Sequence, residues 1–176
     1  MKIAIVSYSF TGNNDKFAAS LASELPATHI RITTQKPFAM KSIVLDMIFS
    51  RTPKVHPHPD SLQQYDLILF VAPVWMGNVA SPVRAYLHAL QSKRQAYGLL
   101  SISGGADGEN PKLMAELLKR TGASPAIVLD QHIKDYITLD SPPTRQDTSA
   151  YKISDTDAVR LSENAIKEIK KLIAPV

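Results

Sequence analysis

Short apolar runs alternate with segments of helical periodicity along most of this chain. Residues 3–7 read Ile-Ala-Ile-Val-Ser without polar alternation, which indicates a strand that is buried on both faces. After a turn at residues 9–13, apolar positions recur at helical spacing from Phe17 to Leu25, and Pro26 ends the segment. The pattern predicts a strand, a tight turn and a helix, and strands of this kind are typical of parallel sheets.

The same unit recurs along the rest of the chain. Further strands are predicted at residues 28–33, 65–73, 97–103 and 125–129, and helices at residues 38–49, from Ser81-Pro82 onward, at 112–120 and at 154–173. Residues 140–150 are polar, contain Pro142-Pro143 and are predicted to form a loop. Five strands with intervening helices predict a single α/β domain over residues 1–176, a doubly wound five-stranded parallel sheet with helices on both faces.

Composition and charge exclude several classes of site. The 176 residues include no Cys, which excludes disulfide scaffolds, cysteine zinc sites and thiol nucleophiles. The 20 Lys and Arg exceed the 16 Asp and Glu by four, but basic and acidic residues are interspersed. We therefore expect a mixed solvated surface and no nucleic-acid partner, with anionic ligands or partners as the alternative.

No targeting or membrane-spanning pattern stands out. No apolar run reaches the roughly 18 residues that a spanning helix needs, and the first residues lack the hydrophobic region and cleavage site of a signal peptide. We expect a cytoplasmic protein without a membrane span.

Three unusual segments follow the first, third and fourth predicted strands. In a sheet of order 2-1-3-4-5 these strands are neighbours, and ligands bind beyond their carboxyl ends, where the strand order reverses. The segments are residues 9–14, 73–82 and 103–108. We expect them to meet at one edge of the sheet.

The first segment, Ser9-Phe10-Thr11-Gly12-Asn13-Asn14, is suited to binding a phosphate group. Small hydrogen-bonding side chains, a glycine and the start of a helix make a neutral cradle, because exposed N–H groups and the helix dipole attract an anion. The alternative is an ordinary capped turn, since Thr and Asn are also favoured at helix starts.

The second and third segments offer a flat ring surface and a flexible backbone. Trp75, the only Trp, follows a buried strand and can lie against a flat ligand; its alternative role is to close the top of the core. Residues 104–108 contain three glycines, which lets the backbone approach a ligand; the alternative is a mobile surface loop.

Taken together, these motifs resemble those of the flavodoxin family. The resemblance rests on Ser9-x-Thr11-Gly12-Asn13, on Pro73-x-Trp75-x-Gly77 with Ser81-Pro82-Val83, and on Ser103-Gly104-Gly105, and it covers nearly the whole chain in order and spacing. It implies a flavodoxin-like fold and FMN as cofactor. The residues that it implies for the phosphate are Ser9, Thr11, Gly12, Asn13 and Asn14, and Phe10 between them is also expected to contact the cofactor. Those that it implies for the flavin ring are Pro73, Val74, Trp75, Met76, Gly77, Asn78, Ser103, Gly104 and Gly105.

The resemblance implies redox chemistry and leaves its kind open. We expect reduction of a quinone or similar small acceptor with NAD(P)H as reductant; the alternatives are an electron carrier for protein partners and a scaffold that has lost the flavin. The family usually has Thr where Asn14 stands, which the Asn amide could replace, although Asp15 adds a negative charge. The third segment lacks an aromatic residue, and the net charge of +4 argues against an acidic electron shuttle.

Other catalytic and metal-binding motifs are weak or missing. The first strand is followed by neither Gly-x-Gly-x-x-Gly nor Gly-x-x-x-x-Gly-Lys, and the chain has no Gly-x-Ser-x-Gly. We predict no metal site and no particular catalytic acid or base. Residues 56–59, His-Pro-His-Pro, are interpreted as a solvated, extended linker, and His29, His88 and His132 as isolated side chains.

Two segments keep alternative interpretations. Residues 38–49 are apolar almost all round, which predicts a buried helix, or else a self-association surface of a homodimer or a wall of the substrate pocket. Residues 131–152 either fold over the flavin as a lid or stay loose.

Overall fold

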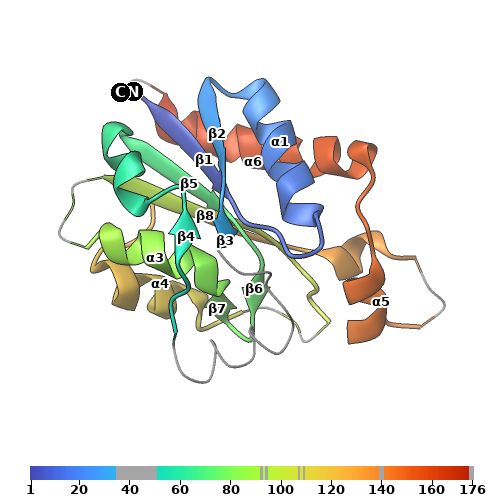
Figure 1. The fold of residues 1–176 in the computed structure, drawn as a ribbon. Coiled ribbons are helices and arrows are strands. Elements are labelled where there is room, and N and C mark those ends of the chain that lie inside the picture. Colours follow the sequence, from blue (N-terminus) through green and yellow to red (C-terminus); the bar gives the residue numbers. More distant parts are fainter. Residues whose placement is uncertain are drawn as a thin grey trace.

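A parallel sheet forms the centre of the molecule. The structure, a computed structural model, describes residues 1–34, 51–91, 93, 95–106, 108, 110–138 and 141–174. The sheet has five strands in the order β2-β1-β5-β8-β9. Their bounds are Ile3–Ser7 (β1), Ala27–Arg31 (β2), Leu67–Val71 (β5), Ala96–Ser103 (β8) and Ile127–His132 (β9). This confirms the predicted order 2-1-3-4-5 and the flavodoxin-like fold class (Figure 1).

The burial of the strands follows their apolar patterns. Every residue of β1 and of β5 is buried, whereas the two edge strands β2 and β9 are partly exposed. In register, Ile3 lies between Ala27 of β2 and Leu67 of β5. The unalternating strands therefore occupy the middle of the sheet, as a sheet covered on both faces requires.

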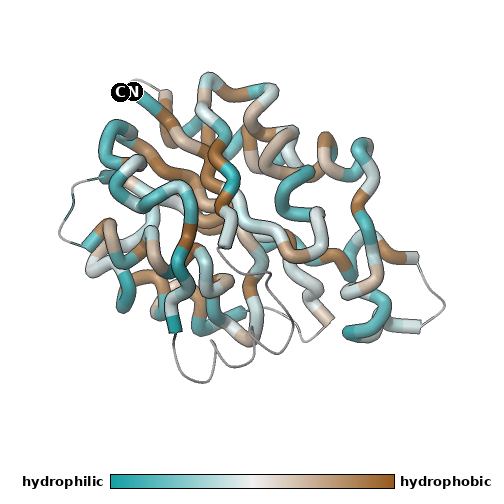
Figure 2. The backbone as a smooth tube through the Cα atoms, in the orientation of Figure 1, coloured by the Kyte–Doolittle hydropathy of each residue, from teal (hydrophilic) through white to brown (hydrophobic). Residues whose placement is uncertain are grey.

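Helices cover both faces of the sheet. Helices α1 (Asn13–Glu24) and α6 (Asp155–Ile173) pack on one face, and α3 (Ser81–Ala89) and α4 (Leu113–Thr121) on the other (Figure 1). In Figure 2 the central strands are the most hydrophobic part of the chain. None of the helices within the described residues is long and apolar enough to cross a membrane.

Local signals explain where these helices begin and end. Pro82 lies in the first turn of α3, where its missing N–H costs no hydrogen bond. Gly122, with a φ of 73°, ends α4 in the left-handed conformation. The side chain of Ser154 accepts a hydrogen bond from the Asp157 N–H at the start of α6, and the Asp157 carboxylate accepts one in return from the Ser154 N–H.

The structure corrects two of the predictions. Residues 140–150 were predicted to be a loop, but Arg145–Ala150 form a short helix, α5, because Thr144 and Asp147 make a reciprocal cap like the one at α6. The strand predicted at residues 125–129 begins at Ile127 and continues to His132. The predicted helix at residues 38–49 lies outside the described residues.

The segment at residues 56–59 is more ordered than a solvated linker. Val55–His56 (β4) pair antiparallel with Thr33–Thr34 (β3), and the carbonyl of Pro57 accepts a hydrogen bond of 2.6 Å from the buried Tyr86 hydroxyl. The side chain of His58 caps a 3-10 helix, η1, at Pro59–Gln64. Both His side chains are exposed, and no group of His, Asp and Glu suited to a metal occurs among the described residues.

Candidate functional site

The carboxyl ends of β1, β5 and β8 lie next to one another. These three strands are adjacent in the sheet, so the segments that follow them emerge at the same edge (Figure 1). We call residues 9–14 the first loop, residues 73–80 the second loop and residues 103–106 the third loop.

The first loop presents the free N–H groups of a helix start. Gly12 precedes α1 with a φ of 95°, and no side chain caps the helix there. The hydrogen bonds within the helix begin with the Lys16 N–H, which donates to the Gly12 carbonyl. The N–H groups of residues 13–15 therefore have no carbonyl partner within the helix. The Ser9 hydroxyl oxygen accepts a 3.0 Å hydrogen bond from the Gly12 N–H, which shapes the turn.

The side chains of Asn13 and Asn14 are buried and serve the fold. The Asn14 amide donates to the Ile102 carbonyl at 2.9 Å and accepts from the Ile102 N–H at 3.0 Å. The Asn13 amide donates to the Tyr151 carbonyl at 3.0 Å and accepts from the Ile153 N–H at 3.2 Å. What these two residues can present to an anion is therefore their backbone N–H groups.

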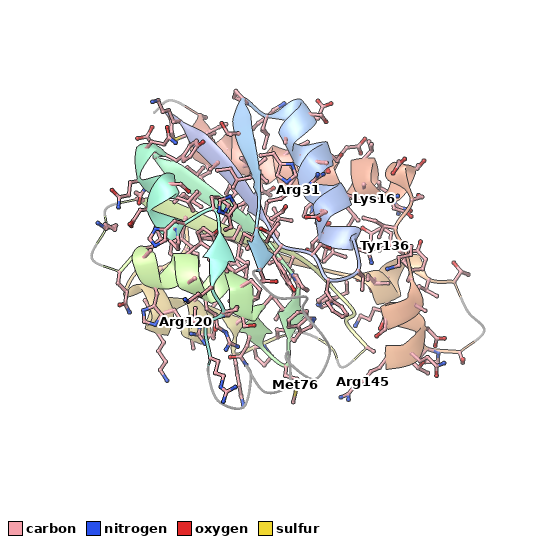
Figure 3. All side chains as sticks on the ribbon, viewed as in Figure 1. Lys16, Arg31, Met76, Arg120, Tyr136 and Arg145 are labelled. Atoms are coloured by element: carbon pink, nitrogen blue, oxygen red, sulfur yellow. The ribbon has the colours of Figure 1, made fainter. Side chains whose placement is uncertain are left out.

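The second loop is a small hairpin that the sequence reasoning missed. Val74–Trp75 (β6) pair antiparallel with Asn78–Val79 (β7), and the two turn residues Met76 and Gly77 have φ angles of 51° and 75°. Two positive φ angles in a two-residue turn match the twist of a hairpin, although an apolar side chain is unusual at the first position. The Met76 side chain projects away from the sheet and is 84% exposed (Figure 3).

Trp75 links the first and second loops. Its ring is half-buried and meets the ring of Phe10 edge to face, with 6.4 Å between centroids. Phe10 is 39% exposed. Val74, rather than Trp75, enters the core on this hairpin, with 5% of its surface exposed. A pair of partly exposed rings at this edge is suited to contact with a flat aromatic ligand.

The third loop is held between two neighbouring segments. Gly105 has a φ of 73°, and a Cβ on it would overlap the side chain of His132, at the end of β9. A Cβ on Gly104 would lie 2.9 Å from the Thr148 hydroxyl of α5. Within the described residues the buried Ser103 hydroxyl has no hydrogen-bond partner. The glycines of the third loop are thus closely packed, and the hydrogen-bonding capacity of its Ser103 hydroxyl is unused among the described residues.

The segment after β9 packs against the third loop. The Lys134 N–H donates to the Gly104 carbonyl at 3.2 Å, and residues Ile133–Tyr136 form a 3-10 helix, η2. The Arg160 guanidinium lies 5.5 Å from the centre of the Tyr136 ring. The described part of residues 131–152 is therefore attached beside the candidate site through β9, η2 and α5.

Two of the histidines interpreted as isolated have side-chain partners. His29 Nε2 lies 3.0 Å from the Ser7 hydroxyl, which donates to the Asp15 carboxylate at 2.8 Å. His132 Nε2 lies 3.3 Å from Asp130, which also accepts from the Asn110 amide at 2.5 Å. The first contact joins the neighbouring strands β1 and β2, which spacing along the chain does not reveal, whereas Asp130 and His132 lie two residues apart on β9.

The environment of His29 makes stability depend on pH. Burial, and then the charge of Arg31, lower the pKa of this imidazole below its ordinary 6.5, while Asp15 opposes them. The unfolded chain therefore binds a proton more readily, so the free energy of unfolding falls as the pH falls through about 6.5. Between about pH 7.5 and 5.5, we expect the His29→Gln variant to lose less unfolding free energy than the parent, measured by urea unfolding.

His88→Gln is the matched control, because His88 is exposed on α3. It should keep the pH dependence of the parent. A His29→Gln variant with the full parental loss would contradict the assignment.

Comparisons with known proteins agree with this fold. No protein-family profile matches the sequence, and no curated protein sequence matches it either. A flavoprotein from Lactobacillus acidophilus NCFM, solved in complex with FMN, is similar in structure with a TM-score of 0.60 and 23% identity over 74% of this chain and 93% of that one. A candidate flavoprotein from Bacteroides eggerthii DSM 20697 gives a TM-score of 0.68 and 14% identity over 99% of both chains.

These similarities define the class of fold. A candidate flavoprotein from Bacteroides uniformis ATCC 8492 gives a TM-score of 0.62 and 15% identity over 77% of this chain and 94% of that one. The strand order, the helix layers and these neighbours together show a flavodoxin-like α/β fold.

Proposed function

We propose that this protein binds FMN non-covalently at the carboxyl edge of its sheet and uses it to reduce a quinone or similar small acceptor with NAD(P)H. The observation that carries the proposal is the meeting of the three loops at the carboxyl ends of β1, β5 and β8. The similar Lactobacillus acidophilus flavoprotein, whose structure contains FMN, supports the choice of cofactor.

The residues at this edge fit the two ends of FMN. The free N–H groups at the start of α1 and the Thr11 hydroxyl would hold the phosphate. Phe10 and Trp75 would lie against the flavin ring. The backbone of Gly104 and Gly105 would border the ring, and the Ser103 hydroxyl, which has no hydrogen-bond partner among the described residues, would offer it a hydrogen bond.

The protein supplies position and polarity rather than acid–base groups. FMN, when bound, supplies reversible transfer of one or two electrons. The side chains of the three loops that the structure describes carry no carboxylate, imidazole or amine, so their role is to bind, orient and limit the access of water. Such a site suits transfer that depends on stacking geometry.

A fluorescence titration tests the cofactor. FMN fluorescence should be quenched on addition of the purified protein at micromolar concentrations, and the protein purified without added ligand should be yellow. A colourless preparation that leaves FMN fluorescence unchanged would favour a scaffold that has lost the flavin.

Steady-state kinetics test the reaction. Oxidation of NADH or NADPH should proceed in the presence of a soluble quinone and FMN-loaded protein. No turnover with any acceptor, together with tight FMN binding, would instead support an electron carrier for protein partners. The net charge of +4 favours the enzyme over an acidic carrier.

Thr11→Ala tests the phosphate end of the site. Removing a hydroxyl that donates to a charged group should cost about 1.5 to 3 kcal/mol, or roughly one to two decades in the dissociation constant for FMN. Thr28→Ala, on an exposed position of β2, is the control and should bind FMN like the parent. Equal affinities of the Thr11 variant and the parent would remove Thr11 from the site.

A further inference from the structure

The extended segment between α5 and α6 forms a wall of the first loop. As described above, the Tyr151 carbonyl accepts a hydrogen bond from the Asn13 amide, and the Ile153 N–H donates one to it. The Lys16 ammonium also donates to the Ile153 carbonyl at 3.1 Å. Three consecutive residues far along the chain are thus fixed beside the start of α1.

Lys152 brings a positive charge to this wall. Its side chain is exposed, and its ammonium donates a 2.6 Å hydrogen bond to the Thr11 carbonyl in the middle of the first loop. A carbonyl orients the ammonium without neutralising it. The sequence predicted a neutral phosphate cradle and did not identify this cation.

The nearby acids are engaged elsewhere. Asp155 pairs with Lys16 at 2.9 Å, and the Asp15 carboxylate accepts from the Ser7 hydroxyl on β1. Asp157 accepts the N–H and the hydroxyl of Ser154. Across the described parts of the chain, no ion pair includes Lys152.

An uncompensated ammonium beside the start of α1 favours an anion there. The first N–H groups of a helix carry a partial positive charge, so the ammonium and the helix end repel each other until a negative group lies near both. A phosphomonoester carries nearly two negative charges at pH 7 and matches this requirement better than a neutral ligand.

We propose that Lys152 determines selectivity for the phosphorylated flavin, favouring FMN over uncharged riboflavin. The proposal rests on the proposed function, since it concerns the phosphate end of the same site. Lys152 acts through its charge and through its hydrogen bond to the Thr11 carbonyl. Its side chain is exposed, so its replacement leaves the hydrophobic core intact.

The test compares two flavins and two salt concentrations. FMN and riboflavin are titrated by fluorescence into the parent, Lys152→Met and Lys152→Arg at about 50 and 300 mM salt. Lys152→Met should bind FMN about three- to tenfold more weakly at low salt, with riboflavin affinity changed less than about twofold. The FMN difference should shrink at high salt because exposed charges are screened, and Lys152→Arg should behave like the parent.

Controls distinguish a failure of the proposed role of Lys152 from a failure of the proposed function. Lys167→Met, at an exposed lysine on α6, removes the same charge elsewhere and should leave both affinities unchanged. If Lys152→Met binds FMN as tightly as the parent, or loses equal affinity for FMN and riboflavin, Lys152 does not determine the selectivity. The proposed function would still stand in that case, provided that the parent binds FMN. If the parent binds no FMN, both proposals fail. Thermal unfolding of each variant checks that the fold is retained.

Discussion

The Gly105→Ala variant is expected to lose about 2 to 5 kcal/mol of unfolding free energy, measured by urea denaturation followed by circular dichroism. The backbone at Gly105 has a φ of 73°, which costs an L-residue about 1 to 2 kcal/mol. The new Cβ would also overlap the side chain of His132. Overpacking of this kind typically costs a further 1 to 3 kcal/mol or so, because the neighbour has to leave its position.

Gly122→Ala isolates the backbone part of this loss. Gly122 has the same φ of 73°, but nothing lies within 4 Å of the position of its Cβ. Its variant should lose only about 1 to 2 kcal/mol. Replacing His132 by Ala should restore part of the stability of Gly105→Ala. If the two glycine variants unfold at the same urea concentration, the contact with His132 has no energetic importance.

Replacing Asn14 with Ala is expected to cost about 2 to 6 kcal/mol in the same unfolding measurement. Strand β5 pairs with β8 as far as Val71 opposite Leu100, and the Asn14 amide bonds the N–H and carbonyl of Ile102, two residues further along β8. Asn14 thus continues the ladder where β5 ends. Without its amide, two buried backbone groups lose their partner, at roughly 1 to 3 kcal/mol each.

Asn164→Ala provides the comparison for this change. Asn164 is exposed on α6, so the same loss of an amide should change the unfolding free energy by no more than about 0.5 kcal/mol. Loss of less than about 0.5 kcal/mol in Asn14→Ala as well would show that water or a shifted strand satisfies Ile102.

The sheet could be predicted because its signals are local. Residues 3–7 and 67–71 are apolar without alternation, and such runs have few alternatives to a central parallel strand. The capping pattern Ser154-x-x-Asp157 marked the last helix for the same reason. The equivalent pattern at Thr144-x-x-Asp147 lies in a polar segment with two prolines, which favours a loop over the short helix α5.

The parts that sequence reasoning missed depend on distant partners. Asn14 and Ile102 are separated by 88 positions, and nothing in either neighbourhood indicates the pairing. His29 and Ser7 meet only because β1 and β2 are adjacent. The hairpin turn at Met76 lacks the usual Asn-Gly, so its positive φ was not visible in the sequence.

The wall that residues 151–153 form beside the first loop also sets when the site can be completed during synthesis. Its hydrogen bonds join residues that are 137 to 141 positions apart. At about 5 to 20 residues per second, the first loop is synthesised roughly 7 to 30 s before its partners. Until then the start of α1 lacks the four hydrogen bonds that residues 151–153 make with residues 11–16, so the shape that the first loop has in the folded protein is completed only late in synthesis.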